Sequence, residues 1–327
     1  MPKLESQPFE SKLDTSSEQF NKNKTSMLSM LEEIDVLLDE AELGGGEHHK
    51  ERLAKRGKLP VRERVFHFLD PDSPFLEISG LAAYKSDYPV GGGAIAGIGV
   101  SAGIECIIFA NDPTVLAGAM HFYSVKKWMR AMQIARDSRL PFIQFVESAG
   151  GDLRPRSNAV VGGTTHFAES GRQFYEITEL SKLNIPTVTV TFGTATAGGA
   201  YQPGMSDYNI FVKDQADVAL AGPPLVQMAT GEISSREDIG GAKMHAEKSG
   251  LAEYLADNDL DGIRIAREVM SHLNWEKEGT KPRFSIEEPL HDQDDLLGLI
   301  EPSLKTPFDI REIIGRIADG SKFEEFK

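Results

Sequence analysis

The segment Ile185-Pro-Thr-Val-Thr-Val-Thr-Phe192 is followed, after Gly193, by Thr194-Ala-Thr-Ala-Gly-Gly-Ala-Tyr-Gln-Pro-Gly-Met205. The first stretch is rich in β-branched residues, which is typical of a strand, and the second consists of small residues that favour a turn. Residues 140–146 form a second such strand, which leads into Glu147-Ser-Ala-Gly-Gly-Asp-Leu153. Because glycine has no Cβ, a ligand can approach the peptide N–H groups of these turns closely.

Either turn alone is most simply interpreted as a tight connection between a strand and a helix. Two such turns, each at the end of a buried strand, predict N–H donors that converge on one ligand oxygen. This arrangement is an oxyanion hole, which stabilises the negative charge that develops on an oxygen during a reaction.

Length and charge limit the class of protein. A chain of 327 residues can form one large α/β domain or two smaller ones. The formal net charge of -15 argues against a nucleic-acid-binding protein, although a local basic patch can still bind a polyanion such as coenzyme A.

The single cysteine, Cys106, lies in the apolar run of residues 104–110 and is expected in the core. One cysteine allows no intramolecular disulfide, and no Cys/His pattern indicates a metal. The sequence contains neither a membrane-spanning stretch nor the apolar core of a signal peptide. We therefore expect no membrane association and a cytoplasmic location; the mitochondrial matrix is less favoured, since no transit peptide is evident.

Strands and helices alternate after residue 111, which predicts a layered α/β core. Ahead of this core, residues 94–100 and 105–111 are expected to form an antiparallel hairpin across the short connection Ser101-Ala-Gly103. A further strand is expected at residues 75–83. The other predicted strands lie at 140–146, 185–192, 209–212 and 218–221, and the predicted helices at 25–43, 47–56, 60–68, 124–139, 165–183, 200–205, 258–273 and 308–317.

The pattern divides the chain into four parts. Residues 1–24 are polar and are expected to be a mobile arm, and residues 25–70 a helical segment that leads into the core. Residues 71–273 form the expected α/β domain. Residues 274–327 are expected to be a linker and the start of a second domain that is absent from the chain.

An ordered series of motifs extends from Lys55-Arg-Gly-Lys-Leu-Pro-Val-Arg-Glu-Arg64 through Glu147-Ser-Ala-Gly-Gly151 and Ala197-Gly-Gly-Ala-Tyr201 to Asp238-Ile-Gly-Gly-Ala242. In this series the chain resembles the N-terminal half of the carboxyltransferase (β) subunit of biotin-dependent acyl-CoA carboxylases, within the crotonase superfamily. Gly222-Pro-Pro-Leu-Val226 indicates the methylcrotonyl-/geranyl-CoA carboxylase branch. The resemblance implies an α/β, crotonase-like layered β-β-α fold with an N-terminal helical arm.

The resemblance also implies an activity and a set of site residues. An acyl-CoA would become an enolate, and the backbone of Gly198 and Gly199 would stabilise its thioester oxygen at the start of a short helix near Ala200. The remaining candidates follow from the same motifs. Ala149, Gly150 and Gly151 would position the thioester, Tyr201 and Phe122 would form a wall of the acyl pocket or pack in the core, and Lys126, Lys127 and Arg130 would contact coenzyme A phosphates or form a solvated basic face.

The chain has no Ala-Met-Lys-Met biotinylation motif and no glycine-rich ATP-binding loop. By resemblance, biotin is therefore expected on a separate domain or protein, coenzyme A is part of the substrate, and no metal is expected. The implied partners are an acyl-CoA, the biotin carboxyl carrier and biotin carboxylase subunits, and a carboxyltransferase C-half or second subunit within an oligomer.

Two other functions remain open. A stand-alone crotonase-type hydratase, isomerase or decarboxylase would need an acidic pair, which the sequence does not identify. A non-catalytic acyl-CoA-binding assembly subunit would bind coenzyme A thioesters without turnover.

Overall fold

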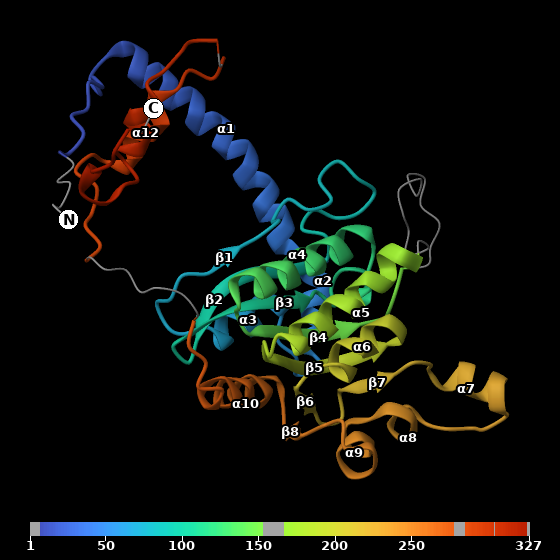
Figure 1. Ribbon diagram of the computed structural model, residues 1–327. Coiled ribbons are helices and arrows are strands. Elements are labelled where there is room, and N and C mark those ends of the chain that lie inside the picture. The colour runs from blue at the N-terminus through green and yellow to red at the C-terminus, as the bar shows by residue number, and fades with distance from the viewer. Residues whose placement is uncertain (1–6, 153–166, 278–284, 304, 326–327) are drawn as a thin grey trace. The chain divides into compact units, whose positions relative to one another are not determined.

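The computed structural model describes residues 7–152, 167–277, 285–303 and 305–325 (Figure 1). The predictions for Leu153, for residues 165–166 and for residues 278–284 of the expected linker lie outside this description. The chain divides into two compact units, one formed by residues 38–278 and the other by residues 1–37 together with 279–327. No helix in the described ranges is long and apolar enough to cross a membrane.

The larger unit contains a mixed sheet with the strand order β1-β2-β3-β4-β5-β6-β8, in which β7 pairs with β5. β1, β2 and β3 are antiparallel, and the remaining pairs are parallel. The strands span Leu76–Glu77 (β1), Ala94–Ser101 (β2), Ile104–Asn111 (β3), Phe142–Ser148 (β4), Thr187–Thr196 (β5), Tyr208–Val212 (β6), Asp217–Ala219 (β7) and Tyr254–Ala256 (β8). The predicted antiparallel hairpin is confirmed, and Ser101 pairs with Ile104 at its turn.

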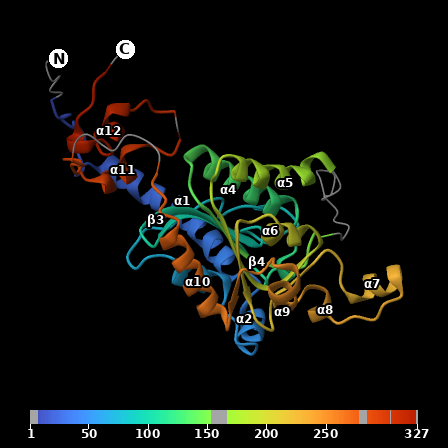
Figure 2. The same cartoon turned by 60° about the horizontal axis from the view of Figure 1, so that its bottom comes forward.

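Helices cover both faces of the sheet (Figures 1 and 2). The helices of this unit are the end of α1 (Glu18–Leu43), α2 (Glu47–Ala54), α3 (Val61–Phe68), α4 (Phe122–Ser138), α5 (Phe167–Lys182), α6 (Tyr201–Gly204), α7 (Pro223–Thr230), α8 (Arg236–Gly240), α9 (Ala242–Met244) and α10 (Asp259–His272). Successive strand side chains point to opposite faces. Phe109 of β3 therefore packs with Trp128 of α4, while Ile108 packs with Phe68 of α3 and Ile263 of α10.

Local sequence explains where the main helices begin. At the start of α4 the N–H of His121 donates to Ser124 Oγ at 2.8 Å, and at the start of α10 Asn258 Oδ1 accepts from the N–H of Asp261 at 3.0 Å. Both contacts involve N–H groups near a helix N-terminus, which the helix itself leaves unpaired. Cys106 is buried in the sheet, as expected for a core residue, and burial raises the pKa of its thiol.

Several elements differ from the sequence predictions, and β8, α8 and α9 were not predicted. β1 contains only Leu76–Glu77, because left-handed backbone at Ser79 and Ala83 prevents an extended strand over residues 75–83. α1 begins at Glu18 rather than at residue 25. α7 was not predicted; it stands out from the sheet in Figure 1 and buries none of its residues.

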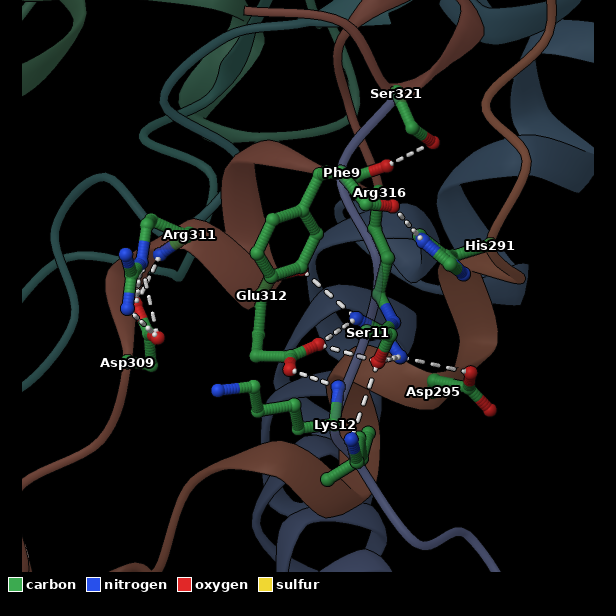
Figure 3. Close-up of polar contacts among 12 residues, drawn as sticks. Phe9, Ser11, Lys12, His291, Asp295, Asp309, Arg311, Glu312, Arg316 and Ser321 are labelled. Carbon is green, nitrogen blue, oxygen red and sulfur yellow. Dashed lines mark hydrogen bonds and ion pairs between the residues drawn. The ribbon is translucent and has the colours of Figure 1, made fainter. Parts of the chain in front are cut away.

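The smaller unit joins the two ends of the chain and contains α11 (Leu296–Leu299) and α12 (Ile310–Ile314). The N–H of Phe9 donates to the carbonyl oxygen of Ser321 at 2.8 Å, and that of Lys12 donates to Glu312 Oε1 at 2.8 Å. Figure 3 shows Glu312 between Ser11, Lys12 and Arg316. Part of the segment expected to be a mobile arm is thus hydrogen-bonded to residues about 300 positions away in the sequence.

Candidate active site at two glycine turns

The two glycine turns lie at the same edge of the sheet. β4 and β5 are parallel neighbours, with Phe142 opposite Thr187 and Ser148 opposite Ala195. Parallel strands place their carboxyl ends at one edge, so the turns that follow them lie next to each other. Ligands of open α/β sheets commonly bind at this edge.

Both turns line one pocket of about 250 Å³. Four of the predicted site residues meet there, namely Gly150 and Gly151 from the first turn and Gly198 and Gly199 from the second. The other lining residues are Met120, Val125, Trp128, Gly171, Gln173, Phe174 and Gln202. The pocket is therefore mostly apolar, with peptide groups on one side and two glutamine side chains.

In the first turn, three of the four successive N–H groups are hydrogen-bonded. Ala149 donates to the carbonyl oxygen of Ala117 at 3.1 Å, Gly150 to Ser148 Oγ at 3.2 Å, and Asp152 to the carbonyl oxygen of Met120 at 2.8 Å. The N–H of Gly151 has no acceptor within the described part of the chain. Gly150 has φ +90, a conformation that favours glycine, and a Cβ there would lie 3.0 Å from the carbonyl oxygen of Thr196.

The second turn is a short 3-10 helix, Ala197–Ala200, that continues into α6. In a 3-10 helix each N–H donates to the carbonyl three residues earlier, so the N–H of Gly199 closes the first turn on Thr196. The N–H of Gly198 precedes that turn and has no carbonyl partner inside the helix. A Cβ on Gly199 would lie 3.2 Å from Ser148 Cβ and Oγ, whereas one on Gly198 would have none of the described atoms within 4 Å.

Ala149, Ala200 and Tyr201 do not line this pocket among the described residues. Ala200 is buried, and Tyr201 is 40% exposed with its ring 4.4 Å from that of Phe174, which does line the pocket. Phe122 also lies outside the pocket, with Lys126 Nζ 4.4 Å from its ring centre. Phe174, Trp128 and Gln202 are site residues that sequence reasoning missed, since helix packing and not a motif brings them to the turns.

The three basic residues predicted for phosphate binding have different environments. Lys126 and Arg130 are exposed on α4, and Arg130 donates to Gln133 Oε1 at 3.0 Å. Lys127 is 2% exposed, with Nζ 3.3 Å from the carbonyl oxygen of Gly91 and 3.8 Å from Glu77 Oε1. Burial lowers its pKa from 10.5 to about 8, although the Glu77 carboxylate acts in the opposite direction. The prediction that Lys127 is an exposed residue available to phosphates is therefore wrong.

A second pocket, of about 480 Å³, adjoins the same two turns through Ala149 and Thr196. Four of its lining residues are of the basic types. His49 and Arg52 belong to α2, Arg56 follows α2, and Arg236 is the first residue of α8. Arg236 also forms an ion pair with Asp217 at 2.8 Å. We call this the basic pocket.

An ion network holds the strand that precedes the first turn. Glu147 forms ion pairs with Lys58 and, at 3.0 Å, with Arg64, and Arg64 Nε donates to Asp259 Oδ2 at 2.9 Å. Arg64 is 1% exposed, and its guanidinium lies 4.3 Å from the ring centre of Phe192. The motif at residues 55–64 thus connects α3 to the carboxyl end of β4. Across the part of the chain that the structure describes, no group of three or more His, Cys, Asp or Glu side chains could hold a metal ion.

Comparisons with known proteins show which family the chain belongs to. The pattern of the carboxyl transferase domain family matches residues 52–327. A probable biotin-dependent acyl-coenzyme A carboxylase beta2 subunit of Mycobacterium tuberculosis is 47% identical over 319 residues, which cover 98% of this chain and 59% of the relative. The mitochondrial methylcrotonoyl-CoA carboxylase beta chain of Dictyostelium discoideum is 41% identical over 318 residues, covering 96% of this chain and 53% of the relative.

A solved structure, the beta subunit of P. aeruginosa geranyl-CoA carboxylase, superposes with a TM-score of 0.85 at 42% identity and covers 98% of this chain and 59% of that one. The predicted crotonase-like α/β fold and the resemblance to the methylcrotonyl-/geranyl-CoA branch are confirmed. The chain spans somewhat more than half the length of the curated relatives that it matches. The chain belongs to the carboxyl transferase domain family.

Proposed function

We propose that this chain provides the acyl-CoA half of a biotin-dependent carboxyltransferase, in which a carboxyl group passes from carboxybiotin to an acyl-CoA. The observation that carries this proposal is the pocket of about 250 Å³ that both glycine turns line. The relatives that are named as acyl-CoA carboxylase subunits support the same activity.

The chain's own contribution is to hold the thioester and to stabilise charge. When the acyl-CoA loses a proton, negative charge develops on the thioester oxygen. An N–H donor that already points at this oxygen lowers the barrier, and removal of one such donor costs about 10²–10³ in rate in known cases. Within the proposed donors Gly198 and Gly199, the N–H of Gly198 is the one without a partner in the helix. Gly151, whose N–H has no acceptor among the described residues, lines the same pocket.

The glycine at position 199 has a second proposed role. Its missing side chain lets the second turn lie against Ser148 of the first turn, because a Cβ would come within 3.2 Å of that side chain. The acyl group would occupy the apolar side of the pocket beside Val125, Trp128 and Phe174. Tyr201 would support Phe174 from outside the pocket.

We further propose the basic pocket for the phosphates of coenzyme A. It adjoins both turns, so a thioester held there could extend its polyanionic end toward Arg52 and Arg56. Lys126 and Arg130 remain the alternative, since both are exposed on α4. Arg52→Gln/Arg56→Gln should weaken binding of coenzyme A more than binding of pantetheine, whereas Lys126→Gln/Arg130→Gln should not; the reverse result would favour α4.

The proposed assembly follows from the same family membership. Residues 71–273 would form the acyl-CoA-binding domain. The biotin carrier, the biotin carboxylase and a carboxyltransferase C-half would be supplied by other domains or proteins within an oligomer. Carboxybiotin provides the carboxyl group, and a bacterial cytoplasm or a mitochondrial matrix would suit this chemistry.

The test is an assay of the purified chain with a carboxylated acyl-CoA and free biotin as the acceptor, with and without the C-terminal part of a relative. Decarboxylation that needs both biotin and the C-terminal part supports the proposal. Turnover by the chain alone without biotin would indicate a crotonase-type enzyme instead. Binding of coenzyme A thioesters without turnover in any mixture would indicate an assembly subunit.

A further inference from the structure

The pocket of about 250 Å³ is lined by a glutamine whose side-chain oxygen has no hydrogen-bond partner among the described residues. Gln202 lies on α6 directly after the second glycine turn, is 0% exposed and lines the pocket. Its Oε1 atom has no hydrogen-bond partner within the described residues. A buried acceptor in this state is unfavourable unless a donor reaches it.

The orientation of this amide follows from its neighbours. The indole Nε1 of Trp128 can only donate, and it donates to Gln144 Oε1 at 3.1 Å. The amide nitrogen of Gln144 therefore points the other way, at 3.3 Å from Thr189 Oγ1 and Ser206 Oγ.

Gln144 Oε1 also accepts from Gln202 Nε2 at 3.3 Å. With its nitrogen directed at Gln144, Gln202 must present its oxygen as the unpaired atom. The nitrogen and oxygen of a glutamine amide are often difficult to tell apart. Here Trp128 can only donate, which fixes the orientation of the Gln144 amide, and Gln144 in turn fixes the orientation of the Gln202 amide.

A second amide lies on the same pocket. Gln173 of α5 is 8% exposed, and its Oε1 is likewise unpaired in the described structure. Met120, Val125 and Phe174, which line the same pocket, carry no hydrogen-bond donor in their side chains. Neither glutamine oxygen has a partner among the described residues, so a molecule in the pocket can supply the donor.

We propose that the pocket selects an acyl group that carries a hydroxyl, a short 3-hydroxyacyl-CoA, whose O–H donates to Gln202 Oε1. This inference rests on the proposed function, because it assumes that the acyl chain enters this pocket. A carboxylate or other acceptor on the acyl chain is disfavoured at the same place, since two acceptors repel each other.

The test compares two coenzyme A thioesters of nearly equal shape, 3-hydroxy-3-methylbutyryl-CoA and 3,3-dimethylbutyryl-CoA, which differ by a hydroxyl in place of a methyl group. Their dissociation constants are measured by calorimetry on the full chain. The hydroxylated thioester should bind roughly tenfold more tightly to the wild type, as expected for one hydrogen bond to a buried acceptor.

In Gln202→Leu this ratio should fall to about one, because leucine has a similar size and no acceptor. Trp128 still donates to Gln144 in this variant, so the fold should persist, and thermal unfolding verifies it. The matched control is Gln215→Leu. Gln215 also has an unpaired Oε1 but does not line the pocket, so the ratio should stay near that of the wild type.

Equal affinity of the wild type for both thioesters would overturn the inference and leave acyl-CoA binding intact, with a water molecule as the partner of Gln202. A preference that survives in Gln202→Leu would also overturn it. Failure of the wild type to bind either thioester would overturn this inference and the proposed function together.

Discussion

Gly199 is the residue whose replacement separates the two glycine turns most directly. Gly199→Val should lower the rate of carboxyl transfer about 100-fold, because a side chain 3.2 Å from Ser148 displaces the N–H donors from the thioester oxygen. Gly204→Ala is the control, since a Cβ there meets no described atom within 4 Å. Steady-state kinetics of both variants measure the effect, and equal rates would show that the turn is not part of the site.

The buried Lys127 makes the stability of the protein depend on pH. Because its pKa is lowered from 10.5 to about 8, the unfolded chain binds more protons than the folded chain between these pH values. The free energy of unfolding should therefore rise with pH across this window, by about 3 kcal/mol at most.

Denaturant titrations at several pH values check this prediction. Lys127→Met should lose the rise between pH 8 and 10.5, and Lys126→Met should keep it. Identical profiles for Lys127→Met and the wild type would mean that the buried ammonium is not the titrating group.

At the residue scale, the sequence predicted what local composition determines. Four of the pocket glycines lie in the two turn motifs, so small residues alone indicated them. The burial of Lys127 was not predicted, although its position continues the helical spacing of the buried Ser124, Ala131 and Ala135 on α4. A lysine charge normally stays in water, and the nearby Glu77 carboxylate and the carbonyl oxygen of Gly91 compensate for the burial of Lys127.

Strand β4 carries the first turn, and the ion network around Glu147 fixes its end. Arg64→Met would leave the buried carboxylate of Asp259 without its charged partner and remove one of two cations from Glu147. Loss of one partner from a buried ion pair typically costs 3–5 kcal/mol, so the free energy of unfolding should fall by about 3 kcal/mol.

The matched control is Arg264→Met on α10. Arg264 is 57% exposed and pairs with Asp261 and Glu268 at the surface, where such pairs contribute under about 1 kcal/mol. Chemical denaturation measures both variants. A decrease of similar size in the two would show that the Glu147 network does not stabilise the fold.

At the element scale, prediction succeeded where the sequence period is strong and failed where the backbone is irregular. The hairpin of β2 and β3 and strand β4 have apolar runs, and β5 is rich in the β-branched residues Thr and Val. The predicted strand at 75–83 is mostly turn, because positive φ values at Ser79 and Ala83 are not visible in a sequence of non-glycine residues. α7 is short and buries no residue, so its sequence carries no core-facing period.

The two ends of the chain form a unit of their own, and Glu312 is central to it. It accepts hydrogen bonds from Ser11 Oγ at 2.6 Å and from the N–H of Lys12, and pairs with Arg316 at 2.7 Å (Figure 3). Burial alone would raise the pKa of Glu312, but these hydrogen bonds and the Arg316 charge outweigh it and lower the pKa below the ordinary 4.5. Its stabilisation is present above pH 4.5 and is lost as pH falls through the lowered pKa.

Glu312→Gln should therefore release the N-terminal segment. The amide of Lys12 should exchange its hydrogen about tenfold faster or more, since its acceptor loses its charge. Hydrogen exchange followed by mass spectrometry measures this at pH 7. Asp309→Asn is the control, because Asp309 pairs with Arg311 at the surface of the same unit. Unchanged protection in Glu312→Gln would show that other contacts hold the segment.

At the scale of the whole molecule, sequence could not predict that residues 8–12 pair with residues 312–322. The segment is polar, which indicates mobility, and its partners lie about 300 residues away, where no local pattern connects them. The expected crotonase-like core, in contrast, follows from repeated strand and helix units that are close in sequence.

The central claim is that the glycine turns stabilise charge on a thioester oxygen, and infrared spectroscopy of a bound acyl-CoA tests it most directly. The thioester carbonyl is labelled with carbon-13, and its stretching band is isolated as an isotope difference. Hydrogen bonds from the turns should shift this band to lower frequency than in free acyl-CoA, and the shift should vanish in Gly199→Val. A band at the same frequency in the bound and free thioester would contradict the claim.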